Sequence, residues 1–485
     1  MATSYRVAPY DRTKVPSARQ LHLMNRLGTG FSTATFTQMR RAGGEKAWFE
    51  QQLDAASVPE SPKGKAVDSW FPRLHDSPAT VWRNNRNQTY QGWEYARDLS
   101  NRSLLRRVHS NRVLLESMVE LWSNHLHVDA NHHPAFTQRA AYDATIRAHA
   151  LGRFDDLLVA ASLHPAMLLY LDTWRSTRKT PNENHGRELL ELHTLGVGNY
   201  TEPMVKQAAR ILSGHTVEPD VWTAYFDPAR HATGEVSLLG FTSANTSGDN
   251  PRLAADFLRF IARHPATART VARKLAIRFV VDEPSGPLVD ELAATYLASG
   301  TDIRATLRAL VDSDEFWASA GRKVRTPADD VVATLRVRRV KVHAPTNRDS
   351  FANALSWTLN STLVFQWPRP DGPPDRAGAW GSTSRMLNSW QMHWGVAGGW
   401  WPRNQAKYPR PTAFLPQKRI RFDRFVDHLS RVVLGRRSTS RLLQAACEAC
   451  DVRPGEKVTK NHPVMSWTFP RLLAVLLDSP AHMTR

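Results

Sequence analysis

The sequence has very few cysteines and no long apolar run. Two cysteines among 485 residues cannot build a disulfide framework, which favours a reducing compartment. No stretch reaches the roughly 18 consecutive apolar residues of a membrane-spanning helix, so we expect no transmembrane segment. Residues 1–24 are polar and basic and contain no apolar core of a secretory signal. These absences together predict a cytoplasmic protein.

The signatures of several enzyme classes are also missing. The chain contains no P-loop, no Gly-x-Gly-x-x-Gly turn, no Gly-x-Ser-x-Gly elbow and no His-Glu-x-x-His pair. Their absence argues against a nucleotide-binding fold, an α/β-hydrolase and a zincin. The two cysteines, Cys447 and Cys450, have the spacing of a redox pair or of half a zinc site, but no second pair accompanies them. We therefore expect both to be small core-facing residues of a helix.

Positive charge is what the sequence has in excess. The formal net charge is +19 at pH 7. Nucleic acid, anionic polysaccharide and phospholipid headgroups are all physically suitable partners for such a chain. An arginine-rich surface without a polymeric partner is the simpler interpretation, and no nucleic-acid-binding motif argues against it.

Apolar residues recur at helical spacing along most of the chain, which predicts a mainly α fold with a multi-helical body. Residues 216–250 are rich in Gly, Pro, Asp and Asn and predict an irregular insert with β-structure, for example at Val236–Leu239. Residues 343–412 are dense in Trp, Pro and Gly and predict an extended segment. Between these two segments, the pattern predicts helices at 251–263, 265–280, 287–298 and 302–317.

The length of the chain suggests more than one lobe. We expect N-terminal helices in residues 1–60 and a central helical body in residues 61–320. Residues 321–485 would then hold the Trp- and Pro-rich segment and C-terminal helices packed on the body.

The most unusual stretch runs from Pro181 to Gly196 and places three glutamates, two histidines and one arginine in a short apolar helix. On an α-helix, which advances about 100° per residue, Glu188 falls in the apolar sector. Glu191 follows Arg187 by four residues, the spacing of a helical ion pair. Buried carboxylates are explained either by a satisfied ionic network or by a site with shifted pKa values. The pattern alone is compatible with both.

In the second case, Glu188 and Glu191 are the candidate acid and base groups or metal ligands. Arg187 would orient a carboxylate or bind an anionic substrate. Asn182 and Asn184 complete the candidate catalytic set.

Four histidines are candidate ligands of a divalent metal, namely His125, His193, His231 and His264. Carboxylate plus imidazole is a usual ligand set for zinc, manganese or iron. His125 and His127 form a His-x-His pair that would face one way only in an extended segment. His264 precedes Pro265, a typical helix-cap arrangement. Taken singly, each histidine is also explained as a structural residue.

The motif Asn182-Glu183-Asn184, with Arg187-Glu188-Leu189 and Glu191-Leu192-His193-Thr194-Leu195-Gly196 after it, resembles the central motif of a large uncharacterised bacterial family. This family is catalogued as domain of unknown function eighteen hundred. The similarity extends over roughly residues 18–482. It includes Leu23-x-x-Arg26-x-Gly28, Trp122-x-Asn124-His125, Tyr200-Thr201-Glu202, His264-Pro265, Lys274-Leu275 and Ser313-x-Glu315-Phe316.

The resemblance implies a largely α-helical fold and an enzyme-like site, without a known reaction. It also implies a sulfatase-like protein partner, because members are often encoded beside such a family, and many members look exported. This chain departs from the family at His215, where tryptophan is usual, and at Ala232, which replaces the aspartate of the histidine-aspartate pair usual at His231. The second departure weakens a metal site at His231.

Two functions follow from these patterns. The first is an enzyme of unknown reaction with a buried carboxylate and histidine site, acting on a small-molecule or polymeric substrate. In its metal-dependent form it would be a hydrolase or an oxidoreductase. The alternative is a non-catalytic binding or scaffold protein for an anionic polymer or glycan, with Trp380, Trp400 and Trp401 exposed to grip the ligand. Tryptophans that pack the extended segment onto the body are the competing explanation.

Overall fold

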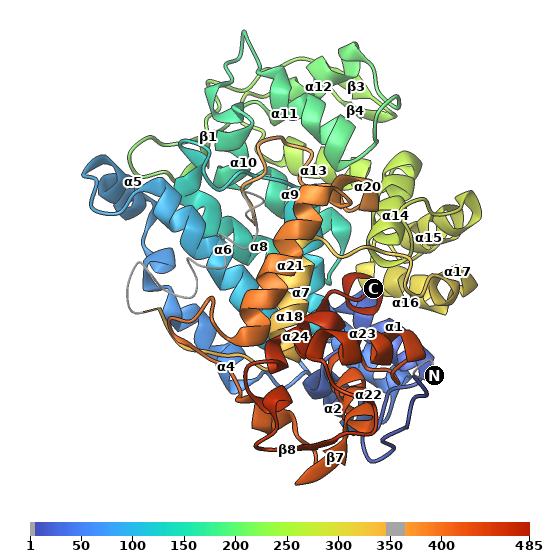
Figure 1. The fold of residues 1–485 in the computed structure, drawn as a ribbon. Helices are drawn as coiled ribbons and strands as arrows, with labels where there is room; N and C mark the ends of the chain where they lie inside the picture. The colour runs from blue at the N-terminus through green and yellow to red at the C-terminus, as the bar shows by residue number, and fades with distance from the viewer. Residues whose placement is uncertain (1–4, 346–363) are drawn as a thin grey trace.

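The chain folds mainly as α-helices that pack around a shared centre (Figure 1). The computed structural model describes residues 5–345 and 364–485. Within these ranges, the named strands form four separate two-stranded antiparallel pairs. The predicted mainly α class is therefore confirmed. Two of the strand pairs, β1–β2 and β3–β4, fall in the segment for which an irregular insert with β-structure was expected.

The α-helices are α1 Ala18–Leu27, α2 Thr33–Arg41, α3 Glu45–Leu53, α4 Pro62–Ala66, α5 Pro78–Arg86, α6 Gly92–His109, α7 Val113–His125, α8 Arg139–His149, α9 Phe154–Ser162, α10 Pro165–Tyr170, α11 Glu183–Glu188, α12 Glu202–Leu212, α13 Arg252–Ala262, α14 Pro265–Phe279, α15 Gly286–Ala298, α16 Ile303–Asp312, α17 Asp314–Ala318, α18 Pro327–Val337, α20 Ala377–Trp380, α21 Thr383–Gly398, α22 Phe422–Val433, α23 Ser440–Cys450, α24 Phe469–Leu477 and α25 Pro480–Met483. The strands are β1 His215–Val217, β2 Ala224–Phe226, β3 Val236–Leu238, β4 Phe241–Ser243, β5 Lys341–Val342, β6 Ala406–Lys407, β7 Arg419–Arg421 and β8 Lys457–Thr459.

Polar caps set many of the helix starts. The Ser17 side chain accepts a hydrogen bond from Gln20 N, and the Gln20 side chain accepts one from Ser17 N. The two bonds form a capping box before α1. Ser285 caps α15 in a similar way, by accepting from Leu288 N. Each cap satisfies an amide that has no partner within the helix. The helices expected at 251–263, 265–280 and 287–298 correspond to α13, α14 and α15, whereas the single helix expected at 302–317 is two helices, α16 and α17, separated at Ser313.

One long helix lies inside the segment expected to be extended. Helix α21 has no proline between Thr383 and Gly398, and Ser382 caps its start by accepting from Arg385 N. Gly399 ends it in the left-handed region, with a φ of +67°. The high tryptophan and glycine content of residues 343–412 concealed this helix, because composition carries no information on periodicity.

Three hydrophobic clusters hold the helices together, and each joins segments that are distant in sequence. The first joins α1–α3 to α7–α17, and the second joins residues 67–136 to residues 328–396. The third joins Tyr10 to the helices after residue 414. Figure 1 shows the N-terminal helices beside α22 and α23, and the Tyr10 amide donates to Asp427 Oδ2 at 2.7 Å. The expected division into 1–60, 61–320 and 321–485 stays a prediction.

The two cysteines lie in the core of the protein. Cys447 and Cys450 are buried and unpaired on α23, as expected for core-facing residues. Burial raises the pKa of Cys447 to about 11 and that of Cys450 to about 12. Across residues 5–345 and 364–485, no helix combines the length and the apolar character needed to cross a bilayer.

A buried ion network joins helices of the first and second clusters. The Asp329 carboxylate, on α18, is fully buried and pairs with Arg107 of α6, Arg278 of α14 and Arg485. Arg107 and Arg278 both also pair with Glu120 of α7, at 2.6 and 2.8 Å. The three guanidinium groups hold the pKa of the Asp329 carboxyl far below its usual range. One carboxylate thus joins four segments.

We predict that Asp329→Ala lowers the free energy of unfolding by about 3–5 kcal/mol, because it leaves three buried guanidinium groups without their shared carboxylate. Chemical denaturation measures this loss. Glu50→Ala is the control, because Glu50 pairs with Arg308 at 2.8 Å at the surface and should cost less than about 1 kcal/mol. Equal losses for the two variants would contradict the central role of Asp329.

Candidate functional site

The motif from Asn182 to Gly196 forms α11 and then a π-helix from Leu189 to His193. Asn182 caps α11, and its side-chain oxygen accepts from Asn184 N at 2.9 Å. Gly186 packs directly on α12, since a Cβ there would lie 2.9 Å from Val205 O. The close contact between the two helices therefore needs glycine at this position.

The π-helix changes where the side chains of the motif point. Its wider turn adds one residue per hydrogen-bonded ring, so the angles of an α-helix do not apply beyond Leu189. Thr194 Oγ1 donates to Leu189 O at 2.6 Å and helps to close this turn. Single π-turns occur frequently at functional sites because they redirect side chains without ending a helix. Here the turn carries Glu191 and His193.

The predicted pairing of Arg187 with Glu191 does not form between these two described residues. Arg187 instead makes a bidentate contact with Glu202 of α12, at 2.6 and 2.7 Å. Glu191 accepts a hydrogen bond from the Tyr200 hydroxyl. The four-residue rule assumes α-helical geometry, and the π-turn begins between the two residues.

A cavity of about 440 Å³ opens beside the π-turn. Its walls come from the end of α7, from the π-turn, from α14 and from the loop Asp371–Arg376. The charged and histidine side chains of this lining are Glu120, His125, Glu191, Arg273, Lys274, Arg278, Asp371, Asp375 and Arg376. Three segments that resemble the family, around Asn124, Glu191 and Lys274, therefore meet the loop Asp371–Arg376 at one cavity.

Lys274 is the charged lining residue without a partner. Among the described residues, no hydrogen bond or ion pair reaches its ammonium group, whereas the other charged lining residues all have one. Burial lowers the pKa of Lys274, and the charges of Asp371 and Asp375 oppose that effect. The sequence showed Lys274 only as part of a Lys-Leu match, because nothing in its local pattern indicates a cavity.

The loop Asp371–Arg376 is held against the end of α7. Gly372 has a φ of +68°, and a Cβ there would lie 2.1 Å from Asn124 O, so no larger residue fits. At its other end, Asp375 pairs with Arg278 at 3.2 Å and with Lys323 at 3.3 Å. The buried ion network thereby fixes one wall of the cavity.

Glu188 lies one helical turn before Glu191 and is half-buried. No hydrogen bond to Glu188 is formed within the described residues. Burial raises the pKa of Glu188, and the charge of Glu191 and that of Asp371 add to the effect. Glu188 is not itself a lining residue, but two carboxylates of the lining raise its pKa.

Two of the four candidate metal-binding histidines come together. His125 Nε2 contacts His193 O at 3.0 Å, and the two rings are 6.3 Å apart between centroids. Within the described residues, His125 Nδ1 and both ring nitrogens of His193 have no hydrogen-bond partner. Burial lowers the pKa of His193 to about 3, so the ring is neutral near pH 7. Such unprotonated nitrogens can accept a hydrogen bond or bind a metal ion.

The other two candidates lie elsewhere and have structural contacts. The His231 ring contacts Ser213 O and Asn245 Oδ1, both at 2.8 Å. His264 Nδ1 accepts from Ala266 N at 3.2 Å and caps α14, as its position before Pro265 indicated. A common metal site for all four histidines is therefore not formed by this geometry, and metal binding by His125 and His193 stays a prediction.

A different cluster has the spacing of metal ligands. In the part of the chain that the structure describes, only Asp330, His393 and His482 place three ligand-type atoms within 4.8 Å of one another. His393 contacts Asp330 at 3.0 Å and Asp478 at 2.7 Å. These carboxylates overcome burial and raise the pKa of His393 to about 9, so a proton already occupies the cluster near pH 7. Carboxylates hold both ring nitrogens of His393, and the cluster is an ion network.

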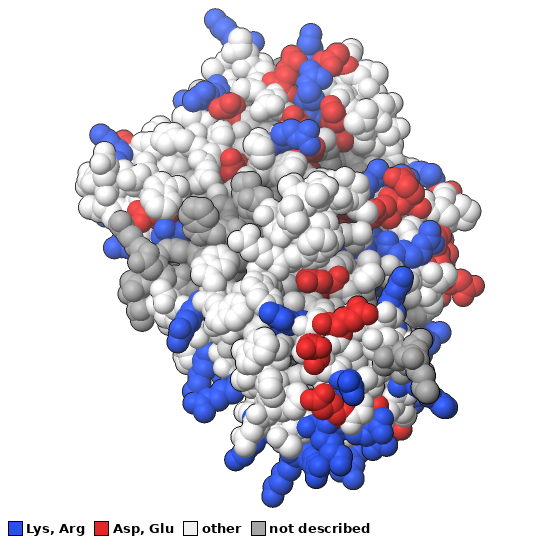
Figure 2. Space-filling view, viewed as in Figure 1, with Lys and Arg blue, Asp and Glu red and all other residues white. Residues whose placement is uncertain are grey.

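The alternative function drew on exposed tryptophans and on the excess of positive charge. Trp400 and Trp401 are 51% and 41% exposed, but Trp380 is 8% exposed and donates to Pro374 O at 2.8 Å. Arg336 donates to Arg107 O and Val108 O, so its guanidinium group binds backbone carbonyl groups inside the protein. Figure 2 shows a group of Lys and Arg side chains at the lower end, where Figure 1 places β7 and β8.

We predict that the protonated His393 ring stabilises the fold below about pH 6.5 and loses this contribution as the pH rises to about 9, because its pKa is raised in the folded chain. The difference in free energy of unfolding between wild type and His393→Gln should shrink by about 3 kcal/mol between pH 6 and 9.5. His22→Gln is the control, because burial lowers the pKa of His22 to about 4. The contribution of His22 to the free energy of unfolding therefore changes only at pH values below about 6.5. A pH-independent difference for His393→Gln would contradict the ion network.

Comparison with known proteins gives one result. The sequence pattern of the family described as "Protein of unknown function (DUF1800)" matches residues 22–484. No curated protein and no solved structure matches the chain. Because the match spans nearly the whole chain and includes the segments that meet at the cavity, the chain belongs to the DUF1800 family.

Proposed function

We propose that the chain is an enzyme and that the cavity between α7, the π-turn, α14 and the loop Asp371–Arg376 is its active site. In this proposal Lys274, in the lining, and Glu188, which acts through the lining carboxylate Glu191, transfer protons to and from a small polar substrate that Glu191 and His125 contact. The observation that carries the proposal is the unpaired Lys274 ammonium in the cavity wall. An ionisable group without a partner is costly in a partly buried site unless a ligand uses it.

The shifts of the two proposed proton carriers support acid-base chemistry. Burial lowers the pKa of Lys274 and raises the pKa of Glu188. Both values therefore move toward neutrality, where a lysine serves as a base and a glutamate as an acid.

The remaining motif residues would act on the geometry of the site. Arg187 ties α11 to Glu202 of α12, and Asn182 caps the start of α11. In this proposal they hold the π-turn in place, and Asn184 is exposed and makes no contact with the cavity lining. His125 and His193 would be the protein's ligands if the active enzyme holds a divalent metal. The expected cytoplasmic location and the sulfatase-like partner stay predictions.

We predict that Lys274 reacts with an amine-acetylating reagent at lower pH in the folded protein than in the denatured chain. Its pKa is lowered by burial, so its neutral, reactive form appears earlier. Mass spectrometry of the peptide that contains Lys274, after labelling at a series of pH values, gives the titration midpoint.

Two variants test the cause. Asp371→Asn should lower the midpoint further, because the charge of Asp371 raises the pKa of Lys274, whereas Arg376→Gln should raise it. A midpoint equal to that of the denatured chain would contradict a functional role for Lys274.

A further inference from the structure

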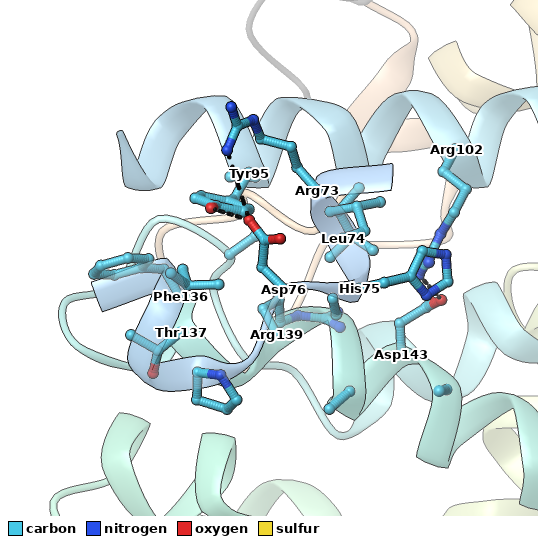
Figure 3. Close-up of a pocket in the computed structure, with 18 of the residues that line it drawn as sticks. Arg73, Leu74, His75, Asp76, Tyr95, Arg102, Phe136, Thr137, Arg139 and Asp143 are labelled. Carbon is cyan, nitrogen blue, oxygen red and sulfur yellow. Dashed lines mark hydrogen bonds and ion pairs between the residues drawn. The ribbon is translucent and has the colours of Figure 1, made fainter. Parts of the chain in front are cut away.

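A second cavity lies away from the proposed active site. It has a volume of about 690 Å³ and shares no lining residue with the first cavity. Figure 3 shows that its side chains come from the 3-10 turn Pro72–His75, from α6, from the 3-10 turn Ala135–Gln138 and from α8. The volume suits a small organic molecule.

Arg139, at the start of α8, lines this cavity and is 1% exposed. Its Nε donates to Val128 O at 2.9 Å, and its guanidinium lies 4.4 Å from the centre of the Phe365 ring. Within the described residues, neither of its two terminal nitrogens has a hydrogen-bond partner. Figure 3 accordingly draws no dashed line to Arg139. Buried guanidinium groups are normally paired, so this one indicates a missing anion.

The other four guanidinium groups of the cavity each have a carboxylate. The pairs are Arg73 with Asp76, Arg102 with Asp143, Arg106 with Asp68 and Arg147 with Glu116. Asp143 Oδ2 also contacts Arg106 at 3.4 Å, and no ion pair joins Asp143 to Arg139. The charge of Asp143 partly offsets the lowering of the Arg139 pKa by burial, but Arg139 is the guanidinium of this lining that makes no ion pair among the described residues. A single anionic group would complete the site.

The rest of the lining defines the body of the ligand. Leu74, Val81, Leu99, Phe136, Ala140 and Ala144 give the cavity an apolar surface. Such a surface disfavours a free phosphate or another fully hydrated anion, because these ions gain nothing from apolar walls. It favours a molecule in which one charged group is joined to a hydrocarbon or aromatic body.

We propose that this cavity binds a monoanionic organic acid with an apolar body, whose carboxylate makes a bidentate contact with the terminal nitrogens of Arg139. The planar carboxylate matches the fork of a guanidinium group. The site is separate from the proposed active site, so either assignment can fail without the other.

Isothermal titration calorimetry tests the proposal with 3-phenylpropanoate as the probe and 3-phenylpropanamide as its neutral counterpart. We expect saturable binding of the carboxylate and at least about tenfold weaker binding of the amide. Inorganic phosphate should bind more weakly than the carboxylate. The proposal is overturned if the carboxylate does not bind, if the amide binds equally well, or if phosphate binds more tightly.

Variants locate the binding. Arg139→Met should weaken binding of 3-phenylpropanoate by about tenfold or more, whereas Arg73→Met, at the exposed rim, and Lys274→Met, in the other cavity, should bind like wild type. Thermal unfolding without ligand shows whether Arg139→Met folds, and Arg139→Lys, which keeps the charge and loses the fork, provides a second variant with an expected intermediate affinity. Unchanged binding by both Arg139 variants would overturn the proposal.

Discussion

The pairing of Asp329 with three arginines is the constraint on which the rest of the structure depends. Its carboxylate is fully buried, and its partners Arg107, Arg278 and Arg485 come from segments hundreds of residues apart. Asp329 is the carboxylate that contacts all three arginines, and its loss would leave each guanidinium with fewer counterions in a medium of low polarity. The helices that carry these groups are therefore fixed relative to one another by charge as well as by apolar packing.

The proposed active site is a consequence of that arrangement. Helix α14 carries both Arg278, which belongs to the network, and Lys274, which lies four residues earlier on the same face. The network also holds Asp375, so the loop that begins with Asp371 is anchored at one end by charge and at the other by the contact of Gly372 with α7. The carboxylates near the network are occupied by arginines. Lys274 is left as an ammonium with no partner among the described residues, which is the property that a catalytic or ligand-binding group needs.

Much of the fold could be predicted from the sequence, because helices α13 to α17 have clear apolar periodicity and α14 to α17 begin at capping residues. The central motif was also identified, since several ionisable residues in a short apolar stretch are unusual. The π-turn could not be predicted from local spacing, and it separated Arg187 from Glu191. Helix α21 was not predicted, because its tryptophan and glycine content suggested an extended segment. The burial of Trp380 depends on tertiary contacts. Lys274, Asp371 and the cluster around His393 were missed for the same reason. Their roles depend on which segments meet in space, and the local sequence does not indicate those contacts.

The most direct test of the active-site assignment is ligand-detected NMR of the purified protein and of Lys274→Met against a panel of small polar metabolites. The account predicts that at least one compound binds the wild type and Arg139→Met but does not bind a folded Lys274→Met variant. The result that would contradict the account is a panel in which every compound that binds wild type also binds Lys274→Met with unchanged affinity.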